Sequence, residues 1–383
     1  MTLLVKNSRL GGFLIIFLTF MFLLSSCNSQ NNTTTKVTVH KHEKNIINPP
    51  TVTIPREPST TIPPAPLSIQ STYQKGVSLL LYGNYPNIEE ISSNLFTQLK
   101  GIGVNSISLN FPFYMSNLYS SSVYTTNQTP TDSEITSVIL EAHKFGFITN
   151  IRPILDGTNL VGGWRGVIAP ESISSWFASY TSMIDNYAVL SQKIGVNILT
   201  IGVELTSMET YTQYWDTLIS QVRDVFKGSI TYSSNWTPQL ISNRVQFWNK
   251  LNFISTDIFV PVQGPSLENM IIQFKNYLST LNTAYSEYKI PIIVSELGTT
   301  SQVGSYTEPW IWNVGTPYSA SAQANYYEAA FVALSSYSFV RGIYIWDVPF
   351  DQLLGNYNPK TDIGYNPLGK EAETVMQQNF AKL

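Results

Sequence analysis

Residues 199–207 read LTIGVELTS, an apolar run that carries one carboxylate, Glu204, near its end. A second run, PIIVSELGT at residues 291–299, carries Glu296 in the same way. Nearly continuous apolar runs of this kind are typical of parallel strands that are covered on both faces. Only 12% of the 383 residues are charged, so the reason for these two glutamates lies in the fold that contains both runs.

Similar runs recur along the chain, and segments with helical periodicity lie between them. Helices are predicted at residues 134–146, 174–195, 210–228 and 321–337, with Gly228 as a C-terminal cap. The predicted apolar face of residues 210–228 consists of Tyr211, Trp215, Leu218, Val222 and Val225. The predicted strands cover residues 76–83, 106–113, 147–155, 198–205, 229–236, 253–262, 291–298 and 340–348.

This alternation of eight strands with helices matches a (β/α)8 TIM barrel in number and size. The competing fold is an open doubly wound sheet, which usually has a Gly-rich turn after its first strand. Residues 83–87 read GNYPN and lack the GxGxxG pattern. The sequence therefore predicts an α/β protein in which residues 71–383 form a TIM barrel.

The N-terminus has the features of a signal peptide, predicted to end at residue 26. Lys6 and Arg9 precede an uncharged apolar run at residues 10–24, which is shorter than the roughly 20 residues of a membrane-spanning helix. The run ends in LSSC, which resembles the lipobox of bacterial lipoproteins. The resemblance implies lipidation of Cys27 and an exported protein anchored to the outside of a bacterial membrane.

Cys27 is the only cysteine of the chain, which excludes an internal disulfide and a thiolate metal cluster. A free thiol is the alternative to the lipid. Residues 27–70 are rich in Thr, Pro and Asn, and such a segment cannot bury enough apolar surface to offset its ordering entropy. We predict a disordered tether there, in which His40 and His42 are solvated, although their spacing could chelate a metal.

The composition excludes one class of partner. The formal net charge is −3, so no basic excess is present to bind a phosphate backbone, and we expect no nucleic-acid partner. Aromatic residues make up 13% of the chain, including 8 Trp. They serve either as core residues or as platforms for flat ligands such as sugar rings, and composition does not decide between these roles.

In a TIM barrel the active site lies at the carboxyl ends of the strands. Glu204 ends the fourth predicted strand and Glu296 the seventh, and these strands face each other across the barrel mouth. Two carboxylates at one cleft suit glycoside hydrolysis, in which one protonates the leaving oxygen and the other attacks the anomeric carbon or activates water. The alternative is that each glutamate is a rim residue paired with Arg or Lys.

Glutamates at these two strand ends resemble the catalytic pair of the large retaining clan of TIM-barrel glycosidases. The chain is most similar to family 113 of the glycoside hydrolases, which includes β-1,4-mannanases, and the similarity covers roughly residues 76–380. The matching pieces are GGWRGVIAP (162–170), LTIGVEL (199–205), ITYSSNW (230–236), VQFWNKLNFISTDIFVPV (245–262), VSELG (294–298), Gln323 and Tyr326 in one helix, GIYIWDV (342–348) and NPLGKEAETVM (366–376).

The resemblance implies a retaining glycoside hydrolase that acts on β-1,4-linked mannan or manno-oligosaccharides through two glutamates, with no metal or organic cofactor. Glu204 would be the general acid/base, which needs a raised pKa, and Glu296 the nucleophile. Trp346, at the end of the eighth strand, resembles the aromatic residue that forms the floor of the sugar site in this clan. The alternative for Trp346 is an ordinary core residue at the barrel rim.

The resemblance also implies substrate-binding residues after strands three and five. Trp164 and Arg165 resemble the family's WRG loop, where Arg165 could bind sugar hydroxyls or orient a carboxylate; a surface salt bridge is the alternative. Asn235 and Trp236 could bind a hydroxyl or form an ordinary turn. Asp257, on the sixth strand, could position a neighbour or satisfy a loop.

Two positions depart from the clan's pattern. Many clan members carry Asn directly before the acid/base, where this chain has Val203; family 113 also lacks that Asn. The family's sixth strand tends to read Asp-Ala-Tyr, whereas this chain has Phe259 in place of the Tyr. If that Tyr hydroxyl orients the nucleophile, Phe259 cannot replace it.

Other functions stay open at this point. A surface carbohydrate-binding lipoprotein without catalysis would keep the aromatic residues and tolerate the loss of either glutamate; both are present, which favours the enzyme. A structural envelope protein is a third hypothesis, because fold alone does not fix function. We expect a monomer. The sequence does not indicate whether cleavage is at chain ends or within chains.

Overall fold

The computed structural model describes residue 69 and residues 71–160, 164–235, 244–355 and 357–383. The chain divides into a unit of residues 1–58 and a unit of residues 59–383, and only the second contains described residues. The signal peptide, lipidated Cys27 and almost all of the tether lie outside the described residues and stay predictions.

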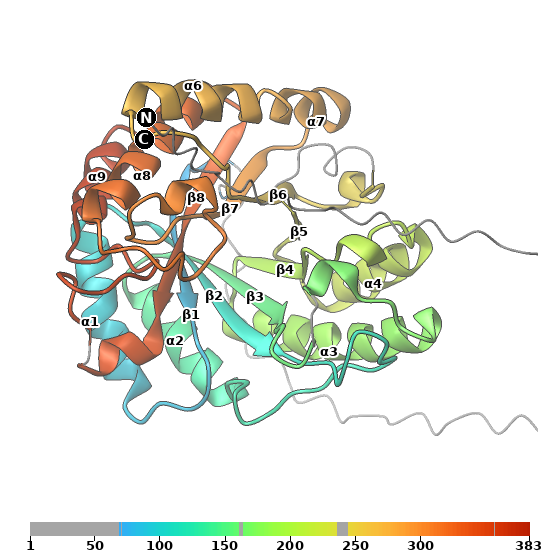
Figure 1. Ribbon diagram of the computed structural model, residues 1–383. Helices are drawn as coiled ribbons and strands as arrows, with labels where there is room; N and C mark the ends of the chain where they lie inside the picture. Colours follow the sequence, from blue (N-terminus) through green and yellow to red (C-terminus); the bar gives the residue numbers. More distant parts are fainter. Residues whose placement is uncertain (1–68, 70, 161–163, 236–243, 356) are drawn as a thin grey trace, which may run out of the picture. The chain divides into compact units, whose positions relative to one another are not determined.

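Eight parallel strands form a closed barrel in sequence order, with β1 paired to β8 (Figure 1). This closed parallel order, with helices outside, defines a TIM barrel, so the predicted fold is confirmed. The strands are β1 (Gln74–Leu80), β2 (Ser106–Phe113), β3 (Ile148–Leu155), β4 (Ile198–Val203), β5 (Ser229–Ser234), β6 (Phe253–Ile258), β7 (Ile292–Leu297) and β8 (Val340–Pro349).

Helices cover the outside of the barrel, as Figure 1 shows. Local signals set their ends: Thr131 and Glu134 form a capping box before α2, and Gly195, with φ 75°, caps the end of α3. No described helix is both long and apolar enough to span a membrane. The helices are α1 (Ile88–Gly101), α2 (Asp132–Lys144), α3 (Ile173–Ile194), α4 (Thr212–Val225), α6 (Leu267–Leu278), α7 (Leu281–Tyr288), α8 (Ala320–Leu334) and α9 (Glu371–Phe380).

The helix predicted at residues 210–228 is shorter than expected. Tyr211 is its N-cap and Val225 is exposed, so neither belongs to the buried face. The prediction that Gly228 caps the helix was wrong, because α4 ends at Val225 and Phe226 is its C-cap. Gly228 is instead needed for packing: a Cβ there would lie 2.3 Å from Cζ of the Phe226 ring. The buried face consists of Trp215, Leu218, Ile219 and Val222.

The inside of the barrel carries hydrogen-bonded polar side chains. Nδ2 of Asn150 on β3 donates to the Ser108 hydroxyl on β2 at 3.1 Å, and Oδ1 of Asn150 accepts from the Thr200 hydroxyl on β4 at 3.1 Å. The hydroxyls of Thr231 on β5 and Ser255 on β6 lie 2.7 Å apart. Strands that read as apolar runs therefore present a polar face inward, and each bond helps to fix the register of neighbouring strands.

We expect Gly76→Ala to destabilise the barrel. A Cβ at Gly76 would lie 2.3 Å from Cδ1 of the Tyr344 ring, and the Tyr344 hydroxyl is fixed by donation to Gln74 Oε1 at 2.6 Å. Overpacking of this kind should lower the free energy of unfolding by about 1–3 kcal/mol, measured by urea denaturation. Gly101→Ala, with nothing within 4 Å of its Cβ, is the control. An equal change in the free energy of unfolding in Gly76→Ala and Gly101→Ala would contradict the expectation.

Candidate active site

A cavity of about 840 Å³ lies at the carboxyl ends of the strands. Glu204, directly after β4, and Glu296, on β7, both line it. The structure therefore brings together the two carboxylates that the sequence placed on the fourth and seventh strands. The rest of the lining comes from the ends of β1, β3, β5, β6 and β8 and from the loops after β3, β4, β7 and β8.

Three side chains donate to the Glu204 carboxylate. Oε2 accepts from Nε1 of Trp164 at 3.1 Å and from Nη1 of Arg165 at 3.5 Å, and Oε1 accepts from Nδ2 of Asn235 at 3.1 Å. Arg165 thus faces Glu204 rather than a surface carboxylate. The Glu204 backbone is in the left-handed region, with φ 50°, and its N–H donates to the Ser233 carbonyl oxygen at 2.8 Å.

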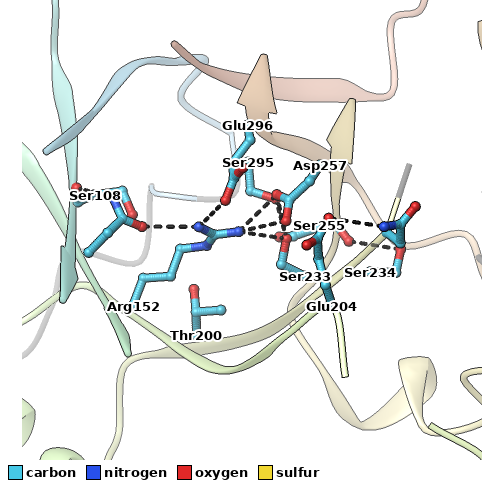
Figure 2. Close-up of polar contacts among 12 residues, drawn as sticks. Ser108, Arg152, Thr200, Glu204, Ser233, Ser234, Ser255, Asp257, Ser295 and Glu296 are labelled. Carbon is cyan, nitrogen blue, oxygen red and sulfur yellow. Dashed lines mark hydrogen bonds and ion pairs between the residues drawn. The ribbon is translucent and has the colours of Figure 1, made fainter. Parts of the chain in front are cut away.

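The Glu296 carboxylate is held by a fully buried arginine that enters from β3. Nη1 of Arg152 lies 2.5 Å from Oε1 of Glu296, and Nη2 lies 2.9 and 2.8 Å from the two carboxylate oxygens of Asp257 on β6. Figure 2 shows the guanidinium between these two carboxylates. One cation therefore connects β3 to β6 and β7 across the inside of the barrel.

Polar groups from two further strands complete this network. The hydroxyls of Ser233 on β5 and Ser295 on β7 donate to Oδ1 of Asp257 at 2.8 and 2.9 Å. Oδ1 of Asn110 on β2 accepts from Nη1 of Arg152 at 3.1 Å. Charge-assisted hydrogen bonds are stronger than neutral ones, so Asp257 and Arg152 together fix the orientation of Glu296. Of the two roles left open for Asp257, these contacts favour the positioning of a neighbour, Arg152.

The two glutamates differ in their electrostatic surroundings. Burial raises the pKa of both Glu204 and Glu296, and the charge of Asp257 raises both further. The guanidinium of Arg152 lowers the pKa of Glu296 through a direct ion pair, whereas the guanidinium nearest to Glu204, that of Arg165, is 3.5 Å away and partly exposed. The pKa of Glu296 nevertheless lies well above that of an ordinary glutamate, because burial outweighs the ion pair, and Arg152 is the group that most favours its ionised form.

Aromatic residues line the cavity together with the carboxylates. Trp346 is only 8% exposed yet lines the cavity, so it is both a packed residue and part of the wall. Phe259 also lines the cavity and packs edge-on against Tyr365, whose hydroxyl donates to the Pro309 carbonyl oxygen at 2.5 Å. Phe259 has no hydroxyl, and the hydroxyl of Tyr365 donates to Pro309. The Glu296 carboxylate accepts a side-chain hydrogen bond from Arg152.

The other predicted residues have mixed outcomes. Trp164, Arg165 and Asn235 line the cavity, while Asp257 is fully buried and acts on Arg152. Trp236 lies outside the described residues. Across the residues that the structure describes, no group of three or more His, Cys, Asp and Glu side chains could hold a metal ion.

Sequence reasoning missed several residues of this site. The only available signal for Arg152 was a cation inside an otherwise uncharged strand. Asp156 follows β3, and its Oδ2 accepts from the hydroxyl of Tyr82, after β1, at 2.8 Å. Trp310 and Trp312 lie in the loop after β7, which gave no motif.

We expect Arg152→Met to destabilise the protein severely, because it leaves Asp257 and Glu296 buried without their counterion. Breaking a buried pair by removing one partner should lower the free energy of unfolding by about 3–5 kcal/mol. Lys250→Ala is the control: it removes the exposed pair with Asp216 and should cost less than about 1 kcal/mol. Chemical denaturation at neutral pH measures both, and a loss for Arg152→Met no larger than the control's would contradict this account.

The sequence pattern of glycoside hydrolase family 113 matches residues 83–370, well over half of the chain. No curated protein matches the sequence. Among solved structures, the family 113 β-mannanase of Alicyclobacillus acidocaldarius, in complex with ManMIm, has a TM-score of 0.72 at 24% identity, covering 82% of this chain and 99% of that chain. A β-1,4-mannanase of the same family, also solved as a complex, gives 0.73 at 22% identity, covering 82% and 100%.

A more distant likeness shows how general the barrel is. The β-D-glucuronidase of Dictyoglomus thermophilum has a TM-score of 0.55 at 16% identity, over 82% of this chain but only 51% of that chain. Likenesses at these identities show the fold, whereas the family pattern covers both strands that carry the paired glutamates. The chain therefore belongs to glycoside hydrolase family 113.

Proposed function

We propose that this protein is a retaining glycoside hydrolase that cleaves β-1,4-linked mannan or manno-oligosaccharides. The observation that carries the proposal is the pair Glu204 and Glu296, which line one cavity with different partners. The family supports glycoside hydrolysis. The mannan substrate is suggested by the solved family members, which are β-mannanases.

In the first step, a carboxylate oxygen of Glu296 attacks the anomeric carbon while Glu204 gives its proton to the leaving glycosidic oxygen. The C–O bond to the leaving sugar breaks, and an ester bond to Glu296 forms. Arg152 orients Glu296 and favours its ionised form before the attack. Esterification removes the negative charge of Glu296, which lowers the pKa of Glu204, so Glu204 can then accept a proton from the attacking water.

The charges of the cavity favour a neutral sugar over a uronic acid. The described lining residues include three carboxylates, Asp156, Glu204 and Glu296, and one cation, Arg165. Arg165 is already engaged, because its Nε donates to the Leu155 carbonyl oxygen at 3.0 Å and its Nη1 faces Glu204. A substrate carboxylate would therefore meet repulsion without a free counterion in this lining, whereas sugar hydroxyls can donate to the carboxylates.

The roles of the two glutamates are tested by removing each side chain. Glu204→Ala and Glu296→Ala should each reduce the cleavage of manno-oligosaccharides by at least about 10²–10⁴-fold. Azide should rescue both variants on an aryl mannoside with a good leaving group. The products should be the β-azide from Glu204→Ala, which keeps its nucleophile, and the α-azide from Glu296→Ala.

Glu268→Gln, an exposed change on α6, is the control and should match the wild type. If the wild type binds the oligosaccharides without cutting them, the protein is a carbohydrate-binding protein and not an enzyme. Rescue products of the opposite anomeric configuration would reverse the two assignments.

The pH profile tests the acid/base role separately. Arg165 lowers the pKa of Glu204, so Arg165→Gln should raise that pKa and move the alkaline limb of kcat/KM to higher pH, since the limb reports loss of the Glu204 proton. Arg165→Lys keeps the charge and should move the limb less. An alkaline limb that stays in place or moves to lower pH in Arg165→Gln would contradict the assignment of Glu204.

A further inference from the structure

The described tryptophans fall into two groups. Seven of the 8 Trp lie among the described residues. Three are fully buried in the core: Trp176, Trp215 and Trp248. The other four line the cavity: Trp164, Trp310, Trp312 and Trp346. Trp312 is 54% exposed and Trp310 41%. Large exposed apolar side chains gathered at a cavity mark a ligand surface, because core packing does not account for them.

Trp310 and Trp312 stand at the tip of a loop that is fixed at both of its ends. The loop joins β7 to α8, and the Ser319 N–H donates to the Ser301 carbonyl oxygen at 2.8 Å. Nearer the tip, the Val303 N–H donates to the Pro317 carbonyl oxygen at 3.0 Å. These two hydrogen bonds join the two arms of the loop near its base and hold its tip at the cavity.

The tip itself is held by Tyr365. The Tyr365 hydroxyl donates to the Pro309 carbonyl oxygen at 2.5 Å, and the Tyr365 ring meets the Trp312 indole edge-on, with centroids 4.9 Å apart at 75°. On its other side Tyr365 packs edge-on against Phe259, with centroids 6.4 Å apart. The Trp312 ring is thus supported from the cavity wall, which reduces the entropy lost when a ligand stacks on it.

The topology places this tip opposite the other exposed indole. Trp164 (39% exposed) belongs to the loop after β3 and Trp312 to the loop after β7. In a closed barrel of eight strands, β3 and β7 are four strands apart in either direction, so these loops lie on opposite sides of the mouth. Trp164 contacts Glu204 directly, whereas the described contacts of Trp312 are with the aromatic wall.

We propose that Trp310 and Trp312 form a saccharide-stacking platform that binds pyranose units of a neutral glycan chain beyond the unit that is attacked. The ligand class rests on the proposed function. The pyranose C–H faces bury apolar surface against the indoles, and the chain runs from this platform across the carboxylates toward Trp164. Such a site favours chains of several units over disaccharides and aryl monosaccharides.

The test measures how binding depends on chain length. β-1,4-linked manno-oligosaccharides from the disaccharide to the hexasaccharide are titrated calorimetrically into Glu296→Gln, alone and combined with Trp312→Ala, Trp312→Phe or Tyr214→Ala. Tyr214 on α4 is a matched control, since it is 38% exposed and does not line the cavity. The same substitutions are made in the active protein, and kcat/KM is measured for each chain length.

Affinity and kcat/KM should rise with chain length in the parent proteins and in Tyr214→Ala. Trp312→Ala should lower the ratio of affinity between the longest and the shortest chain about tenfold, and the ratio of kcat/KM likewise. A factor of ten corresponds to 1.4 kcal/mol. Trp312→Phe should recover part of it, because an aromatic face remains.

Three results would overturn the platform: no length dependence in the parent, an equal loss at every chain length in Trp312→Ala, or no binding of any oligosaccharide. If Glu296→Gln binds the series but the wild type cuts none of it, the proposed function fails, and the length dependence of binding still decides the platform.

Discussion

The mouth of this barrel depends on one buried positive charge. Arg152 is fully buried, and without it Asp257 and Glu296 would be two carboxylates in a low-dielectric interior with Glu204 beside them. Taking ions out of water costs several kcal/mol for each ion unless paired charges and hydrogen bonds offset it. The guanidinium meets both conditions, because its two terminal nitrogens contact separate carboxylates on separate strands.

The polar interior explains how a barrel can hold such a charge. Many TIM barrels are filled by branched apolar side chains, whereas here Ser, Thr and Asn side chains connect β2 to β3, β3 to β4, and β5 to β6. The network around Arg152 continues this pattern toward the carboxyl ends, with Ser233 and Ser295 bonded to Asp257. Directional hydrogen bonds therefore position the strand ends and, with them, the carboxylates that these ends carry.

The sequence was sufficient for the fold and for the placement of two glutamates at one cavity, because both depend on local patterns. Each strand is a short buried run, and Glu204 and Glu296 follow from the strand count and from the rule that TIM-barrel sites lie at strand ends. The rest of the site depends on contacts between residues distant in sequence. Arg152 lies 144 positions from Glu296, and no local pattern shows that a strand arginine will meet carboxylates on the far side of the barrel.

The tip of the loop between β7 and α8 also depends on contacts that the sequence does not show. The role of Trp312 depends on Tyr365, a residue from a later loop, so the stretch around Trp312 had no readable pattern of its own. The prediction for Gly228 failed for a different reason. A glycine after a helix is most often a cap, but at this position glycine is needed because its backbone packs closely against the Phe226 ring. Local sequence preferences predict helices and strands well, but they do not predict the role of a residue that depends on contacts with residues distant in the sequence.

The left-handed backbone of Glu204 has an evolutionary consequence. A residue with a Cβ carries a strain of roughly 1–2 kcal/mol in this region, and glycine relieves it. Glu296 lies in ordinary strand backbone, so replacing it brings no such relief. In a lineage released from selection for turnover, mutation of Glu204 to glycine, directly after β4, would relieve this strain, whereas no such relief is available at Glu296. Selection for stability and selection for activity therefore oppose each other at this one position.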